Sequence, residues 1–84
     1  MKLLWDRGAH KDYLYWHQTD RTKVKKINEL IRKIMNTPTQ GFDNLQRLRG
    51  DYKGYWSRQI DTNHRLIYKF DLHAVYIVAC RYHY

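Results

Sequence analysis

The second half of the chain contains four short segments that are expected to be strands, separated by links only a few residues long. The expected strands are residues 46–49, 55–60, 65–70 and 75–82. The links between them are rich in aspartate, asparagine and glycine, which favour tight turns. A parallel connection needs a dozen or more residues, so neighbouring strands joined this way must run antiparallel. The sequence therefore predicts an antiparallel meander.

The first half of the chain predicts a short strand at residues 2–5 and two helices, at about residues 7–18 and 21–35. Asp6 is a suitable N-cap for the first helix. The second helix carries apolar residues at helical spacing and cations opposite them, and this stripe is expected to pack on the sheet. Its members are Val24, Ile27, Leu30, Ile31 and Ile34.

Together these segments predict one α+β domain over residues 1–84, with both helices on one face of a twisted, mainly antiparallel sheet. The other face of that sheet is expected to be open and able to bind a partner.

Charge narrows the choice of partner. Sixteen Lys and Arg residues against eight acids give a net charge of +8 and a pI near 9.8. Such an excess of positive charge favours a polyanionic partner. Nucleic acid is the first expectation, although an acidic protein segment would also be attracted to this surface. No apolar run is long enough to span a membrane, and one cysteine, Cys80, leaves no internal disulfide. A cytoplasmic protein is the simplest expectation.

Metal and cofactor sites are not expected. The five histidines lack ligand spacing, and no glycine-rich phosphate loop is present. Cys80 lies inside an expected strand and is interpreted as a core thiol, and His64 is interpreted as structural.

The chain ends on four residues with useful chemistry: Arg81, Tyr82, His83 and Tyr84. Imidazole exchanges protons near neutral pH, guanidinium binds phosphate, and tyrosine rings stack on bases. If Arg65 and His83 both point to the open face, with Arg49 nearby, cations and tyrosine rings interleave there. That combination is typical of a groove for single-stranded RNA.

Five segments carry a resemblance to a known family: residues 12–16 (DYLYW), 24–31 (VKKINELI), 54–58 (GYWSR), 64–68 (HRLIY) and 79–84 (ACRYHY). They resemble the YoeB/Txe branch of the RelE-type toxins of bacterial toxin–antitoxin systems, end to end and without gaps. The resemblance implies a RelE-like fold and a small endoribonuclease, or mRNA interferase, that cuts mRNA in the A site of the 70S ribosome. It also implies that no metal is used and that a cognate antitoxin inhibits the protein.

In such a reaction a 2′-hydroxyl attacks the adjacent phosphate, which requires a base, an acid and cations for the added negative charge. By resemblance, Arg65 would stabilise the phosphorane, His83 would be the acid, and Tyr84 would orient phosphate or base. The expected RNA-binding residues are Arg49, Arg58, Tyr55 and Arg81.

One position departs from the family pattern. Gln46 stands where the family has a glutamate base, and a neutral amide cannot accept the proton as a carboxylate does. Three explanations stay open. His83 acts as the base, or Asp43 or Asp51 reaches in, or the protein is a catalytically weak or inactive module that still binds RNA or ribosome and antitoxin.

The resemblance also implies partners. An acidic antitoxin segment that folds on binding would suit the +8 surface. DNA would be contacted only indirectly, through the antitoxin complex, and the choice between monomer and homodimer stays open. A gyrase-directed toxin of the same fold is a further alternative, against which the retained nuclease residues argue.

Overall fold

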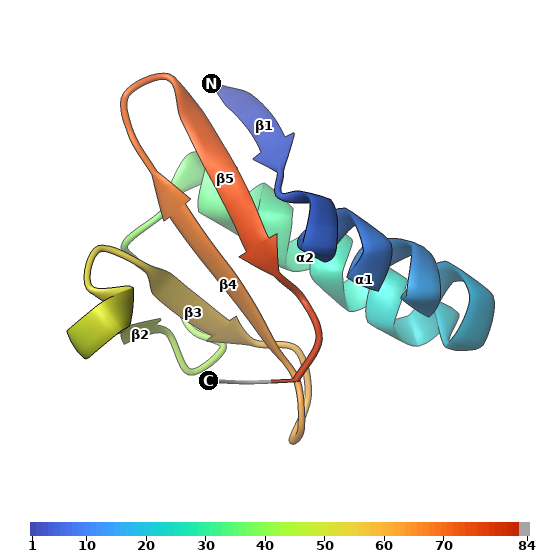
Figure 1. Cartoon of the computed structure of the whole chain (residues 1–84). Helices are drawn as coiled ribbons and strands as arrows, with labels where there is room; N and C mark the ends of the chain where they lie inside the picture. The colour runs from blue at the N-terminus through green and yellow to red at the C-terminus, as the bar shows by residue number, and fades with distance from the viewer. Residues whose placement is uncertain (83–84) are drawn as a thin grey trace.

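The computed structural model describes residues 1–82 of the chain, and its elements follow the expected order (Figure 1). They are β1 (Lys2–Trp5), α1 (Arg7–Thr19), α2 (Arg21–Asn36), β2 (Gln46–Arg47), the 3-10 turn η1 (Gly50–Tyr52), β3 (Trp56–Gln59), β4 (Arg65–Phe70) and β5 (Ala74–Ala79).

The strands form one five-stranded sheet in the order β1-β5-β4-β3-β2. The pairs β2–β3, β3–β4 and β4–β5 are antiparallel, as the short links predict. β1 pairs in parallel with β5 at one edge, and the two helices form the connection that leads from β1 to the rest of the sheet. The predicted α+β class with a mainly antiparallel sheet is confirmed.

Two aspartates set the helix boundaries. Asp6 accepts a hydrogen bond from the backbone N–H of Gly8 and begins α1. Asp20 lies at the junction of both helices. Its backbone N–H donates to the Trp16 carbonyl at the end of α1. Its side chain accepts a hydrogen bond from the backbone N–H of Thr22 at the start of α2. A single extended residue therefore joins the two helices.

The core lies between the helices and one face of the sheet. All five members of the apolar stripe on α2 are buried, as predicted. They share one cluster with Trp16 of α1 and with Leu66, Tyr68, Val75 and Ile77 of the two central strands. Neither helix within residues 1–82 combines the length and apolar character needed to cross a membrane.

The last strand is shorter than expected, ending at Ala79 rather than Tyr82. The indole N–H of Trp16 donates to the Cys80 carbonyl (2.9 Å), so the chain leaves the strand pattern there. Tyr82 then adopts a left-handed conformation with φ of 62°. Burial, followed by the nearby Asp12 carboxylate, raises the pKa of the Cys80 thiol to about 12, consistent with the predicted core thiol.

Arg58, which was expected to contact RNA backbone, lies in the interior. The residue is 0% exposed. Its Nη2 donates to the carbonyls of Thr37 (3.0 Å) and Gln40 (2.6 Å), and its Nε contacts the Tyr68 hydroxyl at 3.3 Å. Because the side chain shares a strand face with the core-packed Trp56, it points toward the helices. Arg58 therefore holds the loop after α2 against the sheet.

Asp43 anchors the far end of that loop. Its carboxylate accepts hydrogen bonds from Lys26 and Lys33 of α2, both at 2.9 Å. Burial raises the pKa of this carboxyl, but the hydrogen bonds from the two lysines outweigh it and lower the pKa overall. The Asp43 carbonyl accepts the backbone N–H of Gln59 at 2.7 Å, which fixes the loop to the end of β3.

The contacts of Arg58 predict a large loss of stability on Arg58→Lys. Lysine keeps the charge, but its single ammonium cannot occupy the positions of both Nε and Nη2, so buried acceptors lose partners. We expect the free energy of unfolding to fall by about 2–4 kcal/mol in urea titrations. The control is Arg49→Lys at an exposed position. Equal losses in the two variants would contradict the anchoring role.

The lysine contacts of Asp43 predict a pH-dependent effect of Asp43→Asn. The folded pKa lies below the unfolded value, so the stabilisation is present above the unfolded pKa and is lost as pH falls through the folded pKa. At pH 7 the variant should be less stable by about 1–3 kcal/mol, and the gap should close in strong acid. Asp51→Asn, at an exposed carboxylate, is the control. A gap that stays constant with pH would contradict the assignment.

Candidate functional site

The candidate site lies on the sheet face opposite the helices. Trp56 and Arg58 point into the core, so Ser57 and its alternate neighbours Tyr55 and Gln59 face the other way. Gln46 of β2 is the direct cross-strand partner of Ser57, and residues directly opposite one another share a face. The open face therefore carries side chains from β2, β3 and β4.

Arg65, the first residue of β4, is the centre of this face. Its Nε donates to the Ser57 hydroxyl at 2.7 Å. Its Nη2 donates to the Asn44 carbonyl and makes a longer contact of 3.4 Å with the Ser57 carbonyl. These acceptors are all uncharged, so they fix the guanidinium without neutralising it.

The charge of Arg65 is therefore available to a ligand. No ion pair within residues 1–82 involves an arginine. Partial burial lowers the pKa of the Arg65 guanidinium from its usual value, but an arginine remains protonated at any physiological pH. A fixed, half-buried cation without an acidic neighbour is a favourable site for an anion.

Uncharged groups surround this cation. Gln46 is exposed at the edge strand, and the Asn44 amide donates to the Gln59 side-chain carbonyl. Asp43 was an open alternative for a base in the site, but its carboxylate is bound to the two lysines of α2. Asp51 lies exposed in η1, beyond the end of β2. The position of Gln46 thus carries an amide on the same face as Arg65.

Arg49 lies at the edge of the sheet, where it precedes η1 and is exposed. It lines an open pocket of about 380 Å³ together with Arg47, Leu48, Gly50 and Lys53. The pocket begins one residue beyond Gln46, so its cations continue the positive surface outward from Arg65.

Tyr55 shares the open face with Ser57 and is half-buried. The ammonium of Lys69 lies 5.4 Å from the centre of the Tyr55 ring and 5.6 Å from that of Tyr76. These residues line a second pocket of about 240 Å³. Aromatic and cationic groups therefore interleave around Tyr55.

The guanidinium of Arg81 stacks at 3.7 Å over the ring of Tyr15 on α1 and at 4.8 Å over the ring of Tyr82. His83 and Tyr84, expected to complete the site, lie outside the described residues.

Sequence reasoning missed Ser57 and Asn44 as partners of Arg65. The alternation of β3 carried a signal for Ser57, since it shares a face with Tyr55. No sequence pattern indicated Asn44, because its carbonyl comes close to Arg65 only when the loop is folded. Residues 1–82 contain no cluster of three His, Cys, Asp or Glu side chains suited to a metal.

Comparison with known proteins identifies the family. A family model described as YoeB-like toxin of bacterial type II toxin-antitoxin system matches residues 5–84. Toxin YoeB of Escherichia coli (strain K12) is 46% identical over 84 residues, which cover 100% of both chains.

Solved structures agree. A YoeB/ParE toxin from Agrobacterium tumefaciens superposes with a TM-score of 0.95 at 41% identity, covering 100% of both chains. YoeB from Staphylococcus aureus is 36% identical, and the match covers 100% of this chain and 98% of that one. It gives a TM-score of 0.93 as a dimer and 0.91 in a heterotetrameric YoeB-YefM toxin-antitoxin complex. With its full length matched in sequence and in fold, this chain belongs to the YoeB-like toxins of bacterial type II toxin–antitoxin systems.

Proposed function

We propose that this toxin is a ribosome-dependent mRNA endoribonuclease that cleaves in the A site by 2′-hydroxyl transesterification. The observation that carries the proposal is the Arg65 guanidinium, held on the open face by neutral acceptors at Ser57 and Asn44. Such a cation needs no rearrangement to receive a phosphate, and no carboxylate within residues 1–82 forms an ion pair with it.

The reaction moves one proton and redistributes charge at one phosphorus atom. The 2′-oxygen bonds to phosphorus as it loses its proton, and the bond to the 5′-oxygen breaks as that oxygen gains one. The products are a 2′,3′-cyclic phosphate and a free 5′-hydroxyl. Between them the phosphorane carries extra negative charge, which Arg65 would stabilise. DNA is not a substrate because it lacks the 2′-hydroxyl.

The hydrogen-bond pattern of Arg65 suits this role. Its contacts use Nε and Nη2, and no hydrogen bond within residues 1–82 engages Nη1. A phosphate oxygen can therefore bind Nη1 without breaking the contacts that orient the group.

Proton transfer is assigned to the terminal residues. His83 would protonate the leaving oxygen and Tyr84 would orient the phosphate or the base, as the family membership suggests. No metal or cofactor is proposed, because proton transfer and charge stabilisation suffice for this reaction.

The proton acceptor is the distinctive feature of this chain. The Gln46 amide is a poor base, and Asp43 is committed to Lys26 and Lys33. We therefore expect slow cleavage, carried by Arg65, Arg49 and His83 without an efficient base. A catalytically inactive module that binds RNA or ribosome and antitoxin is the second candidate, and Gln46 is the observation that favours it.

RNA binding is assigned to the surface around Arg65. Arg49 would contact the phosphate backbone from the edge pocket, and Tyr55 would stack on an unpaired base. The bound RNA would be a single-stranded mRNA codon in the 70S ribosome. The toxin would therefore act in the cytoplasm.

The proposed protein partner is a cognate antitoxin, as in the Staphylococcus aureus YoeB-YefM complex, and we expect it to bind through an acidic segment. Charge complementarity with the +8 chain supports this pairing. Contact with DNA would come only through that complex, and a homodimer like that of the Staphylococcus aureus toxin is proposed for the free chain.

Gln46→Glu tests the proposal directly. A carboxylate at this position restores a positioned base, a group that contributes roughly 10²–10⁴-fold to such reactions. On ribosomes programmed with a defined mRNA, we expect cleavage at least about tenfold faster, with 5′-hydroxyl ends. The rate should also gain a limb in the acidic range that the wild-type chain lacks, because the new base must lose a proton.

Gln18→Glu is the matched control, since it makes the same charge change at an exposed site on α1. It should leave the rate unchanged. If Gln46→Glu also leaves the rate unchanged, position 46 is not a base site, and growth arrest with intact mRNA would favour the binding module.

A further inference from the structure

We propose that His64 is a positioning residue, whose imidazole holds the backbone of Tyr82, the residue that precedes His83 and Tyr84 in the chain. The inference rests on the proposed function for its catalytic consequence. The contact itself can be tested without RNA.

Both backbone polar groups of Tyr82 are bound at the start of β4. Its N–H donates to His64 Nδ1 at 2.6 Å, and its carbonyl accepts the backbone N–H of Arg65 at 2.8 Å. The residue adopts a φ of 62°, which costs a residue other than glycine about 1–2 kcal/mol. Such a conformation persists only where neighbouring contacts impose it. The hydrogen bond from the Tyr82 N–H to His64 Nδ1 is one of the two backbone contacts that do so.

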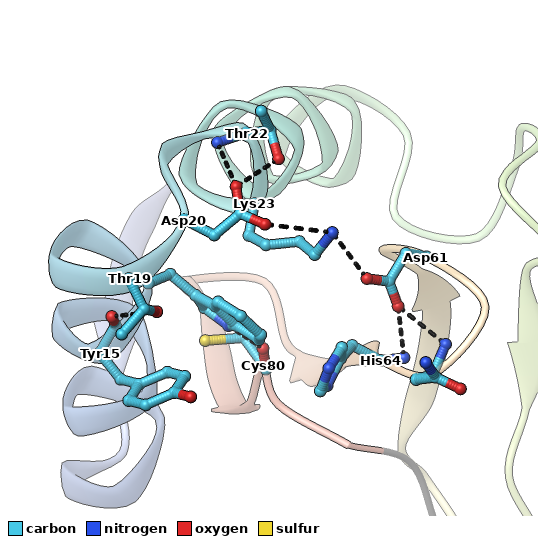
Figure 2. A network of polar contacts seen from close by, with 10 residues as sticks. Tyr15, Thr19, Asp20, Thr22, Lys23, Asp61, His64 and Cys80 are labelled. Atoms are coloured by element: carbon cyan, nitrogen blue, oxygen red, sulfur yellow. Dashed lines mark hydrogen bonds and ion pairs between the residues drawn. The ribbon is translucent and has the colours of Figure 1, made fainter.

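His64 is itself held from several directions. Its ring packs edge-on against buried Trp16 of α1, with centroids 4.8 Å apart. Its backbone N–H donates to Asp61, which forms an ion pair with Lys23 at 2.8 Å (Figure 2). Lys23 also contacts Asp20, the residue that joins the two helices. The imidazole is therefore fixed to the helical layer as well as to the sheet.

This contact depends on the protonation state of the imidazole. Nδ1 can accept a hydrogen bond only in the neutral ring that carries its proton on Nε2. A proton on Nδ1 would turn it into a donor facing the Tyr82 N–H donor, and the Tyr82 N–H would lose its hydrogen-bond acceptor. Histidine is the side chain that makes this change near neutral pH.

The charged groups around His64 come from three segments. Asp61 and Lys23 belong to the loop before β4 and to α2, and Arg81 donates to the Tyr82 hydroxyl at 2.9 Å. Burial raises the pKa of Asp61, but the hydrogen bonds from Lys23 and from the Asn63 backbone lower it overall. Asp61 is therefore ionised throughout the range in which an imidazole titrates.

Two substitutions separate the hydrogen bond from the shape of the residue. His64→Asn places an amide oxygen near the position of Nδ1, so it can accept the same hydrogen bond but cannot titrate. His64→Leu introduces a side chain with the same branched shape as asparagine but without a hydrogen-bond acceptor. Both lose the aromatic contact with Trp16, so that contact cannot explain a difference between them.

The first measurement is amide exchange of Tyr82 by NMR on the full chain, normalised to intrinsic rates between pH 5 and 8. We expect the wild-type protection to disappear as His64 becomes protonated. His64→Asn should keep its protection over the whole range, and His64→Leu should lack it throughout. Amides of α2 report whether each variant is folded.

If folded His64→Leu keeps wild-type protection at Tyr82, the inference is overturned. Should His64→Leu fail to fold, the comparison of wild type with His64→Asn still decides. Wild-type protection at Tyr82 that stays constant between pH 5 and 8 would then contradict the proposal.

The second measurement is cleavage on programmed ribosomes. We expect His64→Leu to lower kcat by about tenfold or more with little change in KM, since small displacements of reacting groups are costly. His64→Asn should restore most of the rate. A wild-type rate in His64→Leu would overturn the positioning role. If the wild-type chain itself does not cleave, the proposed nuclease function is wrong, and the exchange data alone decide the contact at Tyr82.

Discussion

The attachment of the last described residues to the beginning of β4 is the constraint on which the candidate site depends. β5 ends at Ala79, and the next carbonyl, that of Cys80, accepts the indole N–H of Trp16 instead of continuing the strand. The chain then turns, and Tyr82 binds the backbone of Arg65 and the ring of His64. A tryptophan in α1 thus helps to determine where the chain meets the proposed phosphate-binding arginine.

Three arginines near this region have different roles because their partners differ. Arg58 is enclosed by carbonyls and the Tyr68 hydroxyl, so its charge serves the fold. Arg81 lies between the rings of Tyr15 and Tyr82. Arg65 alone of the three is fixed by neutral acceptors on the open face, with its charge available to a ligand. The high positive charge of the chain therefore does not act as one uniform surface.

Much of the fold followed from local patterns. The stripe on α2 and the short turns of the meander gave the helices, the antiparallel strands and the open face. The interior position of Arg58 was not predicted, although the side chain shares a strand face with Trp56 and Ile60, which already favoured the core side. The early end of β5 depends on a contact between Trp16 and Cys80, residues far apart in sequence, which no local pattern records. No local pattern predicts the contact of Asn44 with Arg65 or the lysine contacts of Asp43 either, since both require the folded loop.

The central claim is that Arg65 and the terminal histidine act on one phosphodiester. The most direct test is a structure of this toxin on a ribosome carrying mRNA whose attacking 2′-hydroxyl is blocked by a methyl group. The account predicts the scissile phosphate within about 3 Å of the Arg65 guanidinium, with the imidazole of His83 at the same phosphate. A scissile phosphate bound instead on the basic outer surface of α2, or a His83 on the helix-covered side of the sheet, would contradict it.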